Sequence, residues 1–224
     1  MRHGPDIALA RLLQLASPAL PVGAYSYSQG LEAAVEARIV RDASSARRWI
    51  EDALELGVAR MEAPVFLRLC SAWRARDATA AMHWNALFLA SRESAELRAE
   101  TAQMGYSLAR LLAELEPPGE LDGWEEVSFP AAFAWAVTRW NIAPGEALVA
   151  YLWAWAENQV MAAIKAVPLG QTDGQKMLLA LGERVAHFAK QSSELDDEAL
   201  GNFVPGLALL SARHETQYSR LFRS

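Results

Sequence analysis

Residues 146–167 constrain the fold most, because they are apolar on nearly every face of a helix. A surface helix has one buried stripe, so this pattern predicts a central, largely buried helix near residues 145–167. Its middle carries three polar residues, Glu157, Asn158 and Gln159. They are spread around the helix at steps of about 100° and therefore need polar partners. Pro168 then stops the helix before a polar turn at 170–174.

The remaining sequence also reads as helices, since it almost lacks the sustained alternation of a half-buried strand. We therefore predict an all-α, single-domain bundle of about ten helices over residues 1–224. The expected helices span 6–16, 26–35, 44–61, 64–76, 77–90, 91–116, 131–140, 144–167, 173–191 and 205–216. Ser26 and Gln29 have the spacing of a capping box for the second of these helices.

Residues 116–130 interrupt the helical pattern with five acidic residues, no basic residue and consecutive prolines. The segment is either a linker between domains or a long surface loop. Composition does not change across it, and helical bundles accommodate such connections, so the surface loop is favoured.

Charge and cysteine content exclude several classes of protein. The formal net charge of −6 disfavours a general nucleic-acid binder, which would need a basic surface. A single cysteine, Cys70, forms no internal disulfide and fits a reducing compartment. The longest apolar run, 147–156, is too short for a membrane span of roughly 20 residues. The apolar residues 7–20 are interrupted by polar ones, so we expect a cytoplasmic protein without a signal sequence.

Catalytic and metal-binding motifs are weak. The segment GQTDGQK at 170–176 differs from a phosphate-binding loop in glycine spacing and in the residue after its lysine. No Glu-x-x-His pair of the di-iron type is present, and Glu183 with His187 is an isolated pair. The apolar neighbours of Cys70 predict an inert thiol. One enzymatic alternative stays open, a helical enzyme that encloses a small molecule around Glu157, Asn158 and Gln159.

Four stretches together resemble the UreF family of urease accessory proteins. They are LLQLASPALPVGAYSYSQGLE at 12–32, SRESAELRAETAQMG at 91–105, NQVMAAIKAVPLGQTDGQK at 158–176 and PGLALLSARHETQYSRLFRS at 205–224. The resemblance extends over essentially the whole chain in the same order.

This resemblance implies an all-α, non-catalytic accessory protein that functions as a scaffold in the maturation of nickel urease. Family members tend to dimerise and bridge UreD, also called UreH, to the GTPase UreG on the urease apoprotein. Nickel and GTP are handled chiefly by the partner proteins, so no cofactor is expected in this chain. The scaffold would also modulate GTPase-coupled nickel delivery.

The resemblance assigns two partner surfaces. The surface facing UreD is the tail, with His214, Glu215, Gln217, Tyr218, Arg220, Leu221, Phe222 and Arg223. Residues 217–224 would be mobile in the free protein and become ordered on binding; alternatively, their apolar side chains fold back onto the core. The surface facing UreG is Lys165, Gln171, Thr172, Asp173 and Gln175.

A structural alternative remains for this second surface, in which Lys165 only extends towards water and Gln171 caps the turn. Thr172 or Asp173 is expected to cap the helix that follows. The proline-rich corner, residues 17–28, contains Tyr25, Ser26 and Tyr27. These residues either line the dimer or UreG face or pack internally.

Overall fold

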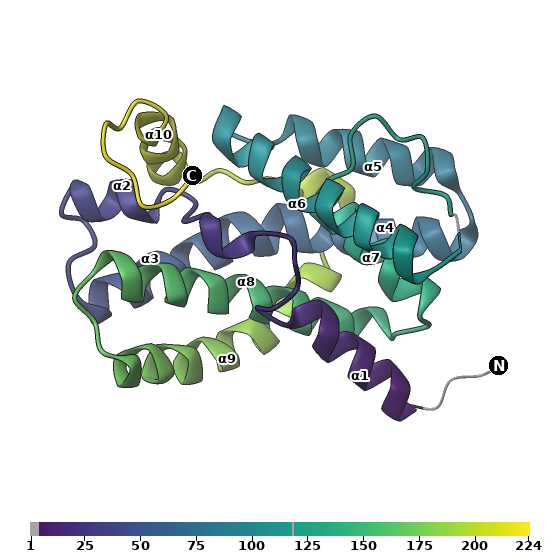
Figure 1. Cartoon of the computed structure of the whole chain (residues 1–224), viewed down its shortest axis with the longest axis horizontal. Helices are drawn as coiled ribbons and strands as arrows, with labels where there is room; N and C mark the ends of the chain where they lie inside the picture. Colours follow the sequence, from purple (N-terminus) through teal and green to yellow (C-terminus); the bar gives the residue numbers. More distant parts are fainter. Residues whose placement is uncertain (1–4, 118) are drawn as a thin grey trace.

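A computed structural model describes residues 5–117 and 119–224. Residues 1–4 of the predicted domain and position 118 of the predicted acidic loop lie outside the described residues. Its α-helices are α1 (Pro5–Ala16), α2 (Leu31–Glu36), α3 (Ala43–Ala53), α4 (Ala63–Ala75), α5 (Ala78–Ala90), α6 (Ala95–Leu115), α7 (Phe129–Arg139), α8 (Pro144–Ala166), α9 (Gln171–Ser193) and α10 (Pro205–His214). Over this described part, all regular structure is helical (Figure 1), which confirms the all-α fold.

The predicted central helix is α8, and its position in the bundle is confirmed. It packs against α9 along their length and also contacts α1, α2, α3, α4 and α7. Figure 1 shows α8 and α9 running side by side beneath α3. Leu148, Leu152 and Val160 are among its fully buried residues, while Val149 and Met161 reach solvent. The helix is therefore enclosed on most of its faces, as its apolar sequence predicts.

An aromatic cluster joins three helices at the centre of the core. The ring of Phe66 on α4 lies 5.9 Å from that of Phe133 on α7 and 5.2 Å from that of Tyr151 on α8. Phe133 and Tyr151 meet edge to face at 5.1 Å. Such contacts add to the free energy gained from burying the rings.

The predicted break between the helices at 44–61 and 64–76 is wrong. α3 continues through a π-helix, Leu54–Glu62, directly into α4. Pro64 lies in the first turn of α4. Proline disrupts an α-helix by clashing with the carbonyl four residues earlier, and the π-helical turns already move that carbonyl out of α-helical register. The continuous rod therefore tolerates this proline.

The predicted capping box of Ser26 and Gln29 is also wrong. Residues Ala24–Ser26 form a short 3₁₀ turn, and α2 begins only at Leu31. Between them Gln29 and Gly30 have φ angles of 51° and 78°, which turn the chain in the left-handed region. The Gln29 side chain is held by tertiary contacts instead of capping a helix.

Other helix ends differ by a few residues. α6 begins at Ala95 and not at Ser91, and it is capped by Ser94, whose side chain accepts a hydrogen bond from the Leu97 N–H at 3.1 Å. The acidic segment ends at Ser128 because Pro130 fits the first turn of α7. This segment also packs on the bundle, since Glu116 and Glu120 accept hydrogen bonds from the indoles of Trp140 and Trp135.

Gly105 permits the close approach of α6 and the end of the acidic segment. A Cβ at this position would lie 2.0 Å from the Val127 carbonyl oxygen and 2.6 Å from the Ser128 carbonyl carbon. Only glycine leaves room for backbone at this distance. Gly105 therefore sets the spacing between α6 and the start of α7.

In the part of the chain that the structure describes, no helix is both long enough and apolar enough to cross a membrane. Cys70 is buried, and its burial raises the pKa of the thiol to about 12. The thiol is therefore protonated at neutral pH, as expected from its apolar neighbours.

Candidate functional site

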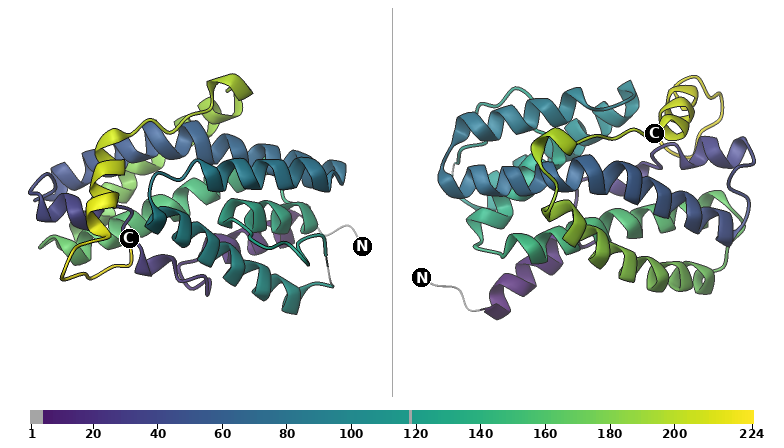
Figure 2. Two further views of the ribbon diagram at one scale, coloured as in Figure 1. Left: turned by 90° about the horizontal axis from the view of Figure 1, so that it is seen from above. Right: turned by 180° about the vertical axis from the view of Figure 1, so that it is seen from behind.

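The C-terminal segment, residues 215–224, lies against α2 and α6. Figure 2 shows α10 and this segment beside α2 and away from α1 in both views. Glu32 of α2 holds the segment, because its carboxylate accepts hydrogen bonds from the backbone N–H groups of Leu221 at 2.7 Å and Phe222 at 3.0 Å. This carboxylate joins the first quarter of the sequence to the last residues.

His214 extends this attachment to α6. Its ring is fully buried, with Nε2 3.1 Å from Glu32 Oε2 and Nδ1 2.7 Å from Glu96 Oε2. The other oxygen of Glu96 accepts a hydrogen bond from Arg220 at 2.6 Å. Two carboxylates and a histidine therefore connect α2, α6 and α10, and buried charged groups need partners of this kind.

The end of the segment lies between the proline-rich corner and α6. The Ser28 N–H donates to the Ser224 carbonyl oxygen at 2.8 Å, and the Arg223 N–H donates to the Ser26 carbonyl oxygen at 2.8 Å. The Ser224 hydroxyl donates to Glu100 Oε2 at 2.8 Å. The predicted tail and the predicted corner are therefore in direct contact.

Lys165 joins the third predicted set of residues to these two. Its ammonium nitrogen lies 5.8 Å from the ring centre of Tyr25 and 5.8 Å from that of Phe222. An ammonium group at this distance is attracted by the π-face of each ring. Residues assigned from sequence to separate surfaces thus meet at Lys165.

The side chains of the segment divide into exposed and buried ones. Tyr218 and Leu221 are 105% and 70% exposed, and Arg220 and Arg223 also face solvent. Phe222 is only 6% exposed. The alternative that the tail folds back onto the core therefore holds for Phe222 and is wrong for Tyr218 and Leu221.

The turn at 170–175 is the start of α9. Gln171, Thr172 and Gln175 are exposed there. The N-cap is Gly170, and Thr172 does not cap α9. Asp173 does contribute to the cap, because its side chain accepts a hydrogen bond from the Gly170 N–H at 3.3 Å from within the first turn. Across the described residues, no hydrogen bond or ion pair joins Lys165 to this turn.

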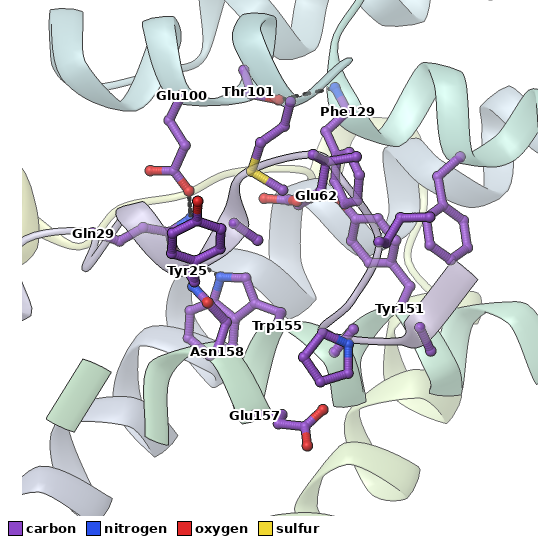
Figure 3. A pocket seen from close by; sticks show the side chains of 18 of the residues that line it. Tyr25, Gln29, Glu62, Glu100, Thr101, Phe129, Tyr151, Trp155, Glu157 and Asn158 are labelled. Atoms are coloured by element: carbon purple, nitrogen blue, oxygen red, sulfur yellow. Dashed lines mark hydrogen bonds between the residues drawn. The ribbon is translucent and has the colours of Figure 1, made fainter. Parts of the chain in front are cut away.

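A cavity of about 180 Å³ lies between the proline-rich corner, α6 and α8. In Figure 3 the side chains of Glu62 and Glu100 point into it, with Trp155 and Tyr151 along its wall. Glu62 is the last residue of the π-helix, and Glu100 lies on the buried face of α6. Both carboxyl groups are thus brought to one space from distant parts of the chain.

Hydrogen bonds hold the polar groups of this cavity. The Tyr151 hydroxyl donates to Glu62 Oε1, and the Gln29 amide donates to Glu100 Oε1 at 2.7 Å. The Trp155 indole donates to the Gln29 side-chain oxygen at 2.8 Å. Burial raises the pKa of Glu62, and it raises the pKa of Glu100 from its ordinary value to about 7. Both carboxyl groups therefore hold a proton more tightly than exposed ones do, and Glu100 changes its charge near neutral pH.

Two of the three polar residues of α8 line the cavity. Glu157 and Asn158 do so, and the Asn158 amide also donates to the Tyr27 carbonyl oxygen at 3.3 Å. Burial raises the pKa of the Glu157 carboxyl. Gln159 instead lies in the core, 2% exposed. The structure therefore brings together only part of the set considered for a small-molecule enzyme.

Four glutamates of these sites were missed from sequence: Glu32, Glu62, Glu96 and Glu100. Glu100 carried a recognisable signal, because it follows Leu97 by three residues on the apolar face of its helix. Glu62 lies within a run of Met61, Ala63 and Val65, where an ionised side chain is unusual. A charged residue on an apolar helix face was thus the available clue.

Within the described residues, neither the cluster of Glu32, Glu96 and His214 nor the pair of Glu62 and Glu100 has the arrangement of a metal site. Among residues 5–117 and 119–224, no group of three or more His, Cys, Asp or Glu side chains is arranged to hold a metal ion. The chemistry that these residues support is hydrogen bonding and charge pairing.

Comparison with known proteins identifies close relatives. The UreF family model matches residues 40–182. A urease accessory protein UreF from Azoarcus sp. (strain BH72) is 56% identical over 228 residues, covering 99% of this chain and 97% of that protein. The UreF protein of Dechloromonas aromatica (strain RCB) is 53% identical, covering 97% of this chain and 98% of that protein. The UreF protein of Janthinobacterium sp. (strain Marseille) is 51% identical with the same coverage.

Proposed function

The chain belongs to the UreF family of urease accessory proteins, and from this we propose that it is a non-catalytic scaffold that bridges UreD (UreH) and the GTPase UreG on the urease apoprotein. Its role in urease maturation follows from the family. The identity of its partners and the bridging are our proposal.

The observation that carries the proposal is the meeting of three segments at Lys165, whose ammonium nitrogen lies 5.8 Å from the ring centres of both Tyr25 and Phe222. Aromatic and arginine side chains are enriched at the energetic centres of protein interfaces. Tyr218 and Arg223 add such side chains to the exposed part of this surface. A surface of this chemistry favours protein binding.

We assign the C-terminal segment to UreD, with Tyr218 and Leu221 as its exposed anchors. Both side chains are more than two-thirds exposed, so a partner can bury them without unfolding this protein. The backbone at Leu221 is already fixed by its hydrogen bond to Glu32. A fixed backbone lowers the entropy cost of binding, which supports the segment as a docking element.

We assign Lys165 and the turn residues Gln171, Thr172, Asp173 and Gln175 to UreG. Lys165 lies in the last turn of α8, and the turn residues lie at the start of α9. They therefore share one end of this helix pair. An exposed lysine beside hydrogen-bonding side chains suits a partner surface that presents carboxylates.

The proposal includes three further expectations. The protein acts in the cytoplasm, forms a homodimer, and leaves nickel and GTP chiefly to its partners while modulating GTPase-coupled delivery. The rival function, an enzyme around Glu157, Asn158 and Gln159, is less well supported because Gln159 lies outside the cavity.

Reconstitution tests the scaffold. The protein is mixed with purified UreD and UreG, the complex is isolated by size exclusion, and urease apoprotein is then activated with nickel in its presence or absence. We expect a complex that contains all three proteins, and activation that depends on this chain. If UreD and UreG associate and activate urease equally well without it, the bridging role is wrong.

A further inference from the structure

We propose that the cavity between the proline-rich corner, α6 and α8 binds a small organic monocation, an alkylammonium or guanidinium ion with a short apolar body. This inference goes beyond the scaffold function and does not depend on which proteins dock outside. The cavity volume of about 180 Å³ sets the size of the ligand. An apolar cavity of about 150 Å³ is large enough for benzene.

The charges around the cavity favour a cation. Its lining contains three carboxyl groups, those of Glu62, Glu100 and Glu157, and two cationic groups, those of Arg92 and Lys165. Arg92 stacks on Phe88 at 4.3 Å, and Lys165 lies over the rings of Tyr25 and Phe222. Arg92 also forms an ion pair with Glu62, and within the described chain its Nε has no hydrogen-bond partner. With three carboxyl groups and two cationic groups, one carboxylate is left in excess when all are ionised.

Glu62 offers a carboxylate oxygen for the ligand. The residue is only 8% exposed, and its Oε1 accepts the Tyr151 hydroxyl. Its Oε2 forms an ion pair with Arg92 Nη1 at 3.7 Å, a separation longer than a hydrogen bond. Within the described chain, Oε2 accepts no hydrogen bond, so an ammonium or guanidinium N–H would supply the missing donor.

The rest of the wall suits an organic ion. The cavity wall contains four aromatic side chains and a methionine: Phe129, Phe133, Tyr151, Trp155 and Met104. Aromatic faces attract alkylammonium and guanidinium ions, and they bury an apolar stem that a hydrated metal ion lacks. The described residues also provide no cluster of three metal-binding side chains. Burial is the main cause of the raised pKa of Glu100, and it outweighs the lowering effects of hydrogen bonds from Gln29 and Ser224 and of the charge of Arg92. A bound ammonium would lower this pKa further.

Unusual backbone conformations occur on two sides of this cavity. Glu62 ends a π-helix, a conformation that occurs frequently at functional sites. Gln29, which positions Glu100 and is itself held by Trp155, has a φ of 51°. Such left-handed conformations of non-glycine residues are unfavourable and cluster at binding sites. Both place polar groups at the cavity, which indicates a built site.

The test uses n-butylammonium as the probe, with n-butanol and butyrate as neutral and anionic probes of similar size. Protein labelled with ¹³C at the methionine methyl groups is titrated at pH 8 and followed by NMR. Met104 and Met161 line the cavity, while Met82 and Met177 do not. We expect the chemical shift of the Met104 methyl group to change saturably with n-butylammonium. We expect n-butylammonium to bind at least about tenfold more tightly than either comparison probe.

Glu62→Gln keeps the size of the side chain and removes its charge. We expect this variant to bind n-butylammonium about tenfold more weakly, while Glu183→Gln, on the exposed face of α9, binds it as the parent does. The proposal is overturned if n-butanol matches n-butylammonium in the parent protein, or if Met104 does not respond. The comparison of probes needs no variant, so it decides the question even if Glu62→Gln fails to fold.

Discussion

The Glu32 carboxylate accepts a hydrogen bond from the Phe222 N–H at 3.0 Å across 190 positions of sequence. The same carboxylate also accepts a hydrogen bond from the Leu221 N–H, and it lies within hydrogen-bonding distance of His214 Nε2. We expect Glu32→Gln to lower the free energy of unfolding by about 2 kcal/mol, because hydrogen bonds to a charged acceptor are lost. Urea denaturation measures this loss, and hydrogen exchange at Leu221 and Phe222 should accelerate. Glu36→Gln, exposed on the same helix, should change stability by less than about 0.5 kcal/mol.

We expect a substitution at Tyr218 to weaken UreD binding without changing the stability of the protein. Because its side chain is fully exposed, Tyr218→Ala should change the free energy of unfolding by less than about 0.5 kcal/mol. If it anchors UreD, affinity for UreD should fall by about 2 kcal/mol, or roughly 30-fold. Phe222→Ala should reduce both stability and binding, because Phe222 is buried. Undiminished UreD capture by a Tyr218/Phe222 double alanine variant would remove the tail from the interface.

Lys165→Ala tests the surface assigned to UreG. The lysine is exposed, and within the described chain its ammonium group makes cation–π contacts but no hydrogen bond or ion pair, so we expect a stability loss below about 1 kcal/mol. Capture of UreG should weaken about tenfold, as for loss of a charge pair across an interface. Lys176→Ala, exposed on α9, is the matched control. Parent-level UreG capture and urease activation by Lys165→Ala would mean that this lysine is structural.

Stability should depend on pH through Glu100. Its pKa in the folded protein, about 7, is above the ordinary 4.5, so the native state binds this proton more tightly than the unfolded state does. The resulting stabilisation is complete below pH 4.5 and is lost as pH rises through 7. We expect a contribution of about 3 kcal/mol between these limits.

Urea denaturation at pH 5 and pH 8 measures this contribution. Glu100→Gln should show a smaller difference between the two pH values than the parent protein. Glu183→Gln should retain the parent difference, since it removes an exposed carboxyl far from this cluster in sequence. An unchanged difference in Glu100→Gln would contradict the raised pKa.

Gly105→Ala should be strongly destabilising. The added Cβ would overlap backbone atoms of Val127 and Ser128, which cannot move aside as a flexible side chain could. We expect a loss of about 3 kcal/mol, at the upper end for overpacking, in thermal or urea unfolding. Gly145→Ala, in α8, meets no atom within 4 Å and should be neutral or stabilising by up to about 1 kcal/mol.

Periodicity predicted the helices because it reports burial along one element at a time. It correctly placed α8 at the centre and predicted α5 from Asp77, whose side chain caps that helix. It failed at Gln29, where contacts with Glu100 and Trp155 determine the backbone. It also did not reveal the π-helix, because the shift of the apolar pattern there, close to Pro64, predicts a break between two helices.

The site was predictable only in part for the same reason. The exposed side chains of the tail and Lys165 were singled out as partner-binding residues through the family resemblance, and that role remains a prediction. The attachment through Glu32 and Glu96 joins residues more than 100 positions apart, and no local pattern specifies such pairs. The cavity is lined by the proline-rich corner and by residues of α1, α5, α6, α7, α8 and the π-helix, so its carboxyl pair became visible only in three dimensions.

The π-helix has a consequence for insertions and deletions. If one residue were deleted between Leu54 and Glu62, the rod from α3 to α4 could become a regular α-helix of the same apolar character. Every side chain on one side of the deletion would then turn by about 100° relative to the other side. Either Glu62 would leave the cavity or Ile50 and its neighbours would leave the core. The length of this nine-residue stretch is therefore as much a determinant of the cavity as the glutamate itself.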